Sequence, residues 1–125
     1  MTPAALLAAV FACTPVAVWD GDGPIWCAEG PKVRLAGIAA RELDGSCRPG
    51  HPCPRASGVA ARDSLVRLLG GARGRGKRGH ILVRAPRMRC EPTGRTYGRI
   101  AARCRMPGVG DLGAAQVRAG VALPW

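Results

Sequence analysis

The sequence predicts a mainly β fold with helices (α+β): a small five-stranded barrel, one interposed helix and a C-terminal helix. Three observations support this prediction. Gly and Pro turn signals recur at short intervals, the stretches between several of them alternate as half-buried strands do, and only two stretches carry helix signals. A chain of 125 residues has room for a single hydrophobic core, so we expect one domain.

The composition predicts a thin aliphatic core and an anionic partner. With only three Trp, one Tyr and one Phe, the core must be built from Ala, Val, Leu and Ile. Nineteen Lys and Arg against eight Asp and Glu give a net charge of +11, and all of these basic residues except Lys32 and Lys77 are Arg. A guanidinium group grips a phosphate with two hydrogen bonds, so we expect a polyanion as partner. The alternative is that Arg only keeps the surface soluble.

Six cysteines in a short chain favour disulfides over metal, because they lack the paired Cys-x-x-Cys spacing of a zinc ribbon. We predict one disulfide from its short loop and consider two others that would close hairpins, with other pairings left open: Cys47–Cys53, then Cys13–Cys27 and Cys90–Cys104. Disulfides indicate an oxidising compartment, so we expect an exported protein that is secreted or periplasmic.

Residues 1–12 form an apolar lead segment that resembles the apolar part of a secretory signal, ending in the Val-x-Ala pattern of Val10 to Ala12. Because no Lys or Arg precedes it, either the true start lies upstream or the stretch is partly a first strand. It is shorter than the roughly 20 residues of a spanning helix, so we expect no stable membrane span. The folded domain is predicted over residues 13–125, as a monomer.

The strand signals begin with a hairpin. Residues 14–19 and 24–28 flank Asp-Gly-Asp-Gly, which is typical of a tight turn. Residues 32–38 form a third strand, in which Arg34 faces away from Val33 and Leu35.

Two further strands are predicted near the C-terminus. Residues 81–84 continue at 88–90, and residues 97–104 form the last strand, paired across a turn at residues 92–94.

Two stretches predict helices. Residues 55–69 place four apolar residues near one stripe and end at Gly70-Gly71, the stripe being Val59, Leu65, Val66 and Leu69. Residues 111–119 form the second helix, with Asp111 as N-cap and Gly120 at its end. This order suits a closed barrel of the oligonucleotide-binding (OB) type better than a parallel sheet, because no βαβ rhythm is present.

Two segments are predicted to be irregular. Residues 43–54 are rich in Gly and Pro, which breaks regular structure. Residues 72–79 are a run of Arg, Gly and Lys that is not expected to pack. This run is either a flexible loop that follows phosphates or a solvated connection.

Three fragments stand out in order: Asp20-Gly21-Asp22, Val33-Arg34-Leu35 running to Glu42, and Tyr97-Gly98-Arg99. Together they resemble the thermonuclease, or staphylococcal-nuclease-like (SNase-like), family. That family has an Asp-Gly-Asp turn, then V-R-L-x-G-I-D-A-P-E, then Y-G-R and a closing helix. The resemblance runs from about Cys13 to Leu123 and is carried by the joint order of the motifs. It implies an SNase-like OB-type barrel and a nuclease that hydrolyses phosphodiester bonds of single- or double-stranded DNA or RNA.

The resemblance implies a role for four residues. Asp22 would be a carboxylate ligand of a calcium ion, and Glu42 the general base or the positioner of the attacking water. Arg34 and Arg99 would hold the phosphate. The chemistry requires such groups because negative charge concentrates on the phosphorus oxygens in the transition state.

The chain departs from the family pattern beside this site. Ala39-Ala40-Arg41-Glu42 stands where the family has Asp-Ala-Pro-Glu, and Gly23 replaces the usual Thr. A missing second carboxylate weakens calcium binding and so weakens the implied activity. Arg41 is expected to pair with Glu42 and lower its basicity. Asp20 or Asp44 would restore the metal site by reaching into the gap.

Two other functions compete with the nuclease. The alternative is a catalytically inactive OB-type barrel that binds nucleic acid or another polyanion by charge. A weaker interpretation is a disulfide-stabilised envelope module that meets anionic lipid or polysaccharide.

Single residues also have simpler explanations. Asp20 and Asp22 suit a turn, Arg34 an exposed strand, and Tyr97 a barrel wall as well as a stacking platform. We interpret the two histidines as surface residues rather than metal ligands: His51 and His80.

Overall fold

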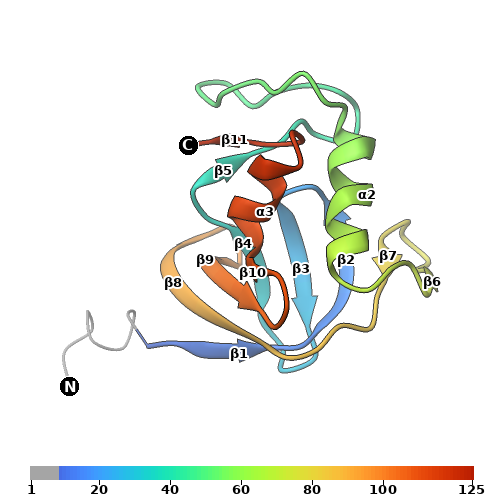
Figure 1. The fold of residues 1–125 in the computed structure, drawn as a ribbon, viewed down its shortest axis with the longest axis vertical. Helices are drawn as coiled ribbons and strands as arrows, with labels where there is room; N and C mark the ends of the chain where they lie inside the picture. Colours follow the sequence, from blue (N-terminus) through green and yellow to red (C-terminus); the bar gives the residue numbers. More distant parts are fainter. Residues whose placement is uncertain (1–8) are drawn as a thin grey trace.

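In the computed structural model, which describes residues 9–125, a curled sheet carries the fold and two helices pack against it (Figure 1). Residues 1–8 of the expected lead segment lie outside the described residues. The strands are β1 (Phe11–Cys13), β2 (Pro15–Asp20), β3 (Gly23–Cys27), β4 (Lys32–Leu35), β5 (Ile38–Ala39), β6 (Gly74–Arg75), β7 (Ile81–Leu82), β8 (Met88–Thr96), β9 (Arg99–Met106), β10 (Gly110–Asp111) and β11 (Leu123–Pro124). The helices are α2 (Gly58–Leu68) and α3 (Leu112–Arg118).

The main sheet runs in the order β1-β8-β9-β4-β3-β2-β7-β6, with β10 beside β9. Every pair is antiparallel except β4 with β9. A separate pair joins β11 to β5. The prediction of a mainly β fold with two helices is therefore confirmed. Among the described strands β1 and β6 are the edges, so the sheet is curled rather than closed by hydrogen bonds.

The first hairpin forms where the Asp-Gly turn predicts it. β2 and β3 pair antiparallel, with Asp20 opposite Gly23. The expected third strand ends at Leu35 and resumes as β5 after a turn at residues 36–37, where Gly37 has a φ of +80°.

Both predicted helices are present. α2 begins at Gly58 because the Ser57 hydroxyl accepts a hydrogen bond from the Ala60 amide at 3.0 Å. Val59 is 44% exposed, so its place in the predicted apolar stripe is wrong. Ala61, Leu65 and Leu69 form the buried stripe at helical spacing, and Val59 points away from it because it lies two residues from Ala61.

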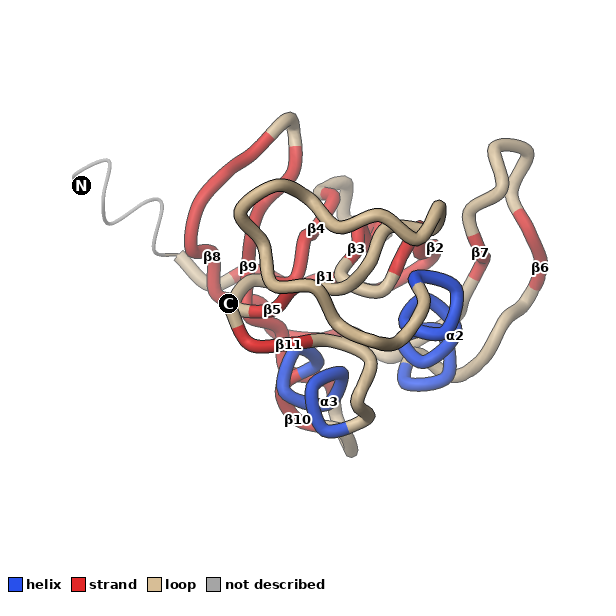
Figure 2. The backbone as a smooth tube through the Cα atoms, turned by 90° about the horizontal axis from the view of Figure 1, so that it is seen from above, coloured by secondary structure: helices blue, strands red, loops and turns tan. Residues whose placement is uncertain are grey.

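Two loop predictions are corrected. Residues 72–79 are not an unpaired run, because β6 pairs with β7 as a short hairpin. The last turn lies at Tyr97-Gly98 rather than at residues 92–94, since β8 continues past Pro92 with a bulge between Pro92 and Gly94. A bulge tolerates the missing Pro amide. The β6–β7 and β8–β9 hairpins project toward the same side of the molecule, at the top of Figure 2.

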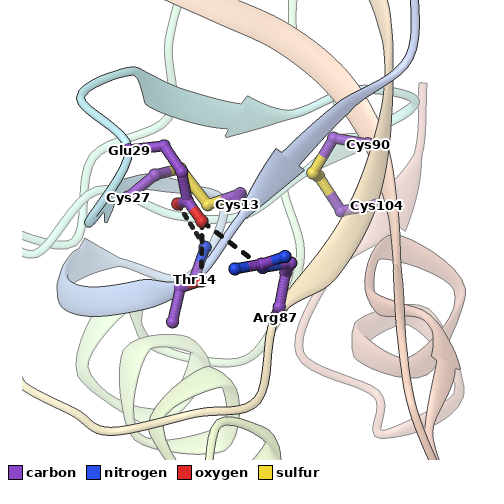
Figure 3. The surroundings of a disulfide bond; sticks show 7 residues. All are labelled: Cys13, Thr14, Cys27, Glu29, Arg87, Cys90 and Cys104. Atoms are coloured by element: carbon purple, nitrogen blue, oxygen red, sulfur yellow. Dashed lines mark hydrogen bonds and ion pairs between the residues drawn. A yellow bond between two sulfur atoms is a disulfide. The ribbon is translucent and has the colours of Figure 1, made fainter.

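The structure contains three disulfides, with the pairings Cys13–Cys27, Cys47–Cys53 and Cys90–Cys104. Beside the first pair, the amide and hydroxyl of Thr14 each donate to Glu29 at 2.7 Å, and Arg87 lies 3.8 Å from the same carboxylate (Figure 3). The hydrogen bonds from Thr14 hold the pKa of Glu29 below its ordinary value. This corner fixes the start of β2 against the β3–β4 turn.

The core is aliphatic, as the composition predicts. Its largest fully buried side chains include Ile25, Leu35, Leu65, Met88 and Leu112. α2 packs against β2, and α3 packs against β9 and α2. Neither helix in the described part of the chain has the length and apolar character needed to cross a membrane.

One buried polar side chain joins the two helices to the first hairpin. Gln116 of α3 is fully buried, and its amide group donates to the carbonyl oxygens of Gly21 and Ala61 at 2.9 Å each. Its own oxygen accepts from the Ser64 hydroxyl at 2.6 Å. Gln116 therefore holds the Asp-Gly turn, α2 and α3 in one arrangement.

We expect Gln116→Leu to lower the free energy of unfolding by about 2–4 kcal/mol, because it leaves buried partners without their hydrogen bonds. Ser64→Ala removes only one of the three bonds and should have a clearly smaller effect. Urea unfolding of both variants measures the difference. Equal losses would contradict the role of Gln116 as the common link.

Candidate functional site

The Asp20–Gly23 turn is held tightly from three sides. A side chain at Gly21 would collide with Ala61 of α2, and a Cβ at Gly23 would lie 2.6 Å from the carbonyl oxygen of Val33. The Leu35 amide donates to the carbonyl oxygen of Asp22 at 2.8 Å. The backbone at this turn therefore places the two aspartates in fixed positions.

Arg34 is turned inward and is only 9% exposed. Its guanidinium pairs with the carboxylate of Asp22 at 3.4 Å and donates to two backbone carbonyls, those of Leu35 and Ile38, at 3.2 and 3.3 Å. The ring of Trp125 lies 5.7 Å from the same guanidinium. These contacts use the guanidinium inside the protein, and they exclude the interpretation of Arg34 as an exposed strand residue.

Asp20 holds a proton over a wide pH range. The residue is 4% exposed, and its carboxyl group accepts a hydrogen bond from the Asp22 amide at 3.4 Å. Burial raises the pKa of Asp20 from 3.8 to about 9, and the neighbouring carboxyl groups of Asp22 and Glu42 add to the rise. Asp20 is therefore neutral near pH 7 and acts there as a hydrogen-bonding group rather than as an anion.

Glu42 pairs with a partner that the sequence did not reveal. Arg48 lies 3.2 Å from its carboxylate, whereas Arg41 donates instead to the carbonyl oxygens of Pro54 and Gly45 at 2.6 and 2.8 Å. The expected pairing of Arg41 with Glu42 is therefore wrong. The guanidinium of Arg41 binds two carbonyl oxygens of the loop instead of the Glu42 carboxylate.

A groove of about 690 Å³ opens beside these residues. It combines two carboxyl groups, four basic side chains, four aromatic or imidazole rings and one proline: Asp20, Glu42, Lys32, Arg48, Arg78, Arg99, Trp19, Trp26, His80, Tyr97 and Pro24. The groove is thus polar and basic at its rims and aromatic along its walls.

The structure divides the four predicted site residues into two pairs. Glu42 and Arg99 line the groove, and Arg99 is partly buried at the start of β9. Asp22 and Arg34 do not line it and pair with each other at a buried position. Asp20, considered only as a rescue for the metal site, lines the groove in place of Asp22.

Sequence analysis did not identify four of the groove residues, and only two of them could have been found from the strand pattern. Trp26 and Lys32 lie on strand faces opposite the core, which the alternation in β3 and β4 could have revealed. Arg48 and His80 come from loops, where no periodicity exists to orient a side chain. His51 and His80 were expected at the surface. Both are partly exposed and each lies beside a tryptophan, and His51 stacks on Trp125 with 3.8 Å between ring centres.

The carboxylates do not fit a calcium site. Ala39 is buried and offers only a methyl group, Asp22 is already paired with Arg34, and Asp44 is exposed and bound to Ser46. Within residues 9–125, no group of three or more His, Cys, Asp or Glu side chains is arranged to hold a metal ion. A calcium site needs several charged oxygens around one point, and these positions do not supply them.

Comparison with models of known protein families gives no match, and comparison with curated proteins gives none either. The thermonuclease resemblance therefore depends on the three short motifs alone.

The titration of Asp20 predicts a pH dependence of stability. The unfolded chain releases this proton near pH 3.8, whereas the folded chain keeps it to about pH 9. The native state thus binds this proton more tightly between these values, so the contribution of Asp20 to stability is fully present below pH 3.8 and is lost as the pH rises toward 9.

We expect Asp20→Asn, which cannot ionise, to abolish the loss of stability that wild-type Asp20 causes as the pH rises. The free energy of unfolding of the variant should exceed that of the wild type by an amount that grows with pH, at up to about 1.4 kcal/mol per pH unit. Denaturant unfolding at several pH values measures the difference. A constant difference from pH 4 to 9 would show that Asp20 does not carry the proton.

Proposed function

We propose that this protein binds the phosphate backbone of a nucleic acid in the groove. The observation that carries the proposal is the convergence of four basic side chains on one groove: Lys32, Arg48, Arg78 and Arg99. They come from separate parts of the chain, namely β4, the disulfide loop and both projecting hairpins. Several separated cations along one groove suit a chain of phosphates better than a single small anion.

The overall charge and the fold support the same proposal. A net charge of +11 attracts a polyanion over a distance. We further propose that the curled sheet is an OB-type barrel of the SNase-like kind, since each of the three family-like fragments contributes a residue to the groove, namely Asp20, Glu42 and Arg99. The three disulfides favour an oxidising compartment, so we place this function outside the cytoplasm.

Binding is the better supported activity because the residues that resemble catalytic ones are neutralised. The charge of Asp22 is matched by Arg34, Asp20 is protonated near pH 7, and Glu42 is paired with Arg48. None of these carboxyl groups is left as an unpaired base beside the groove.

The test is the salt dependence of binding to an oligonucleotide. We expect Arg99→Ala to weaken binding and to reduce the slope of log affinity against log salt by about one, because one phosphate contact is lost. Fluorescence anisotropy in the absence of divalent ions measures both quantities. Arg118→Ala is the matched control, since Arg118 is exposed at the end of α3 and lies outside the groove. Equal effects of the two substitutions would refute a specific role for the groove.

Phosphodiester hydrolysis is the second candidate, and one observation favours it. Asp20 and Glu42 line the groove together with Arg99, so two carboxyl groups and a guanidinium face the same volume. Such a set can position a water beside a held phosphate. What the chain lacks is a carboxylate at position 39.

Ala39→Asp tests this candidate. We expect millimolar calcium to raise the melting temperature of the variant by a few degrees, because an added carboxylate supplies a missing ligand, and to leave the wild type unchanged. Calcium-dependent cleavage of single-stranded DNA should appear in the variant alone. Equal calcium stabilisation and cleavage in the wild type would show that hydrolysis is already its function.

A further inference from the structure

The aromatic residues are concentrated in the groove rather than in the core. The chain has five Trp, Tyr and Phe residues in total, and three of them line the groove: Trp19, Trp26 and Tyr97. Trp19 is 37% exposed and Tyr97 is 92% exposed. Since the buried core is aliphatic, packing within the fold does not account for these rings. Aromatic surface left open beside basic residues is typical of a binding site.

Two of the rings form a pair on the groove wall. The rings of Trp26 and His80 lie with their centres 5.3 Å apart and their planes tilted by 30°. The ammonium group of Lys32 lies 5.9 Å from the centre of the Trp26 ring. Trp26 is opposite Lys32 in the β3–β4 register and the ammonium lies over the indole, so a flat group that binds at this ring would have a cation beside it.

Gly76 in residues 72–79 makes room for one of these rings. A side chain at Gly76 would collide with the imidazole of His80, and a Cβ at Gly79 would lie 3.8 Å from the Trp19 ring. Glycine at position 76 therefore has a structural reason, because a larger residue would displace His80. Gly76 and Gly79 lie beside aromatic rings, while Arg78 of the same hairpin lines the groove.

The basic side chains flank the rings on two sides. Arg78 belongs to the β6–β7 hairpin and Arg99 begins β9 just after the β8–β9 turn. Both hairpins project on the same side, with β2, β3 and β4 between them (Figure 2). A strand of nucleic acid lying across these three strands would meet cations at either side and rings in the middle.

We propose that the groove selects single-stranded nucleic acid by stacking bases on the Trp26–His80 pair, while Arg78 and Arg99 hold the flanking phosphates. This inference rests on the proposed function and names its substrate class. A duplex keeps its bases stacked inside and presents only phosphates, so it cannot use the rings. Base stacking on aromatic side chains tolerates any sequence, so we expect little base preference.

The experiment compares three probes with equal phosphate counts at fixed salt: an oligothymidylate of about 12 nucleotides, the same backbone without bases, and a duplex. We expect the oligothymidylate to bind most tightly. Trp26→Leu should weaken its binding roughly 5- to 100-fold without changing the binding of the abasic strand, whereas Trp26→Phe, which keeps a ring, should retain most of the affinity. Thermal melting of each variant confirms folding.

The outcomes separate this inference from the proposed function. Equal binding of the abasic strand and the oligothymidylate by the wild type, lost on Arg99→Ala, would overturn base stacking and leave the charged groove in place. Tighter binding of the duplex would overturn single-strand selection. Absence of binding to all three probes would overturn both proposals.

Discussion

The buried amide of Gln116 is the contact on which the arrangement of the protein depends. It hydrogen-bonds to the Asp-Gly turn and, within α2, to the backbone of Ala61 and the hydroxyl of Ser64, so it joins α3 to two segments that are far from it in the sequence. In a small domain the aliphatic core fixes distances between layers but does not fix their register, because apolar contacts have no direction. A fully satisfied polar group inside the core supplies that direction. This arrangement bears on the groove, since Asp20 of the turn lines it and α2 starts against the backbone of Glu42, which also lines it.

The core is aliphatic, and most of the aromatic side chains line the groove instead. Disulfides and small side chains stabilise the interior, so the indole rings are not required there. The sheet then carries aliphatic residues on its inner face and Trp26 with Lys32 on its outer face. The result is a surface on which flat rings and cations lie close together, while Asp22 and Arg34 pair with each other at a buried position outside the groove.

Local chemistry explains which features could be predicted from the sequence. The Asp-Gly turn, the Asp111 cap and the pairing of nearby cysteines each depend on a few neighbouring residues. Strand alternation also predicted that Arg34 faces away from Val33. It could not predict that this face is covered, because the cover comes from Trp125, about ninety positions away in the chain. The prediction of a turn at residues 92–94 was wrong for a related reason. β8 pairs with β9 on both sides of Pro92, and these distant contacts outweigh the local preference of Pro92 for a turn.

The Cys47–Cys53 ring encloses two residues that touch different parts of the protein. Arg48 reaches Glu42, and His51 stacks on Trp125 above the buried Arg34. The Cys47–Cys53 disulfide therefore holds both a groove residue, Arg48, and the ring that packs on Trp125, His51. In a reducing compartment the ring would open and both contacts would lose their anchor together. Oxidation of one pair of thiols thus fixes Arg48 on the groove and His51 on Trp125 in a single step.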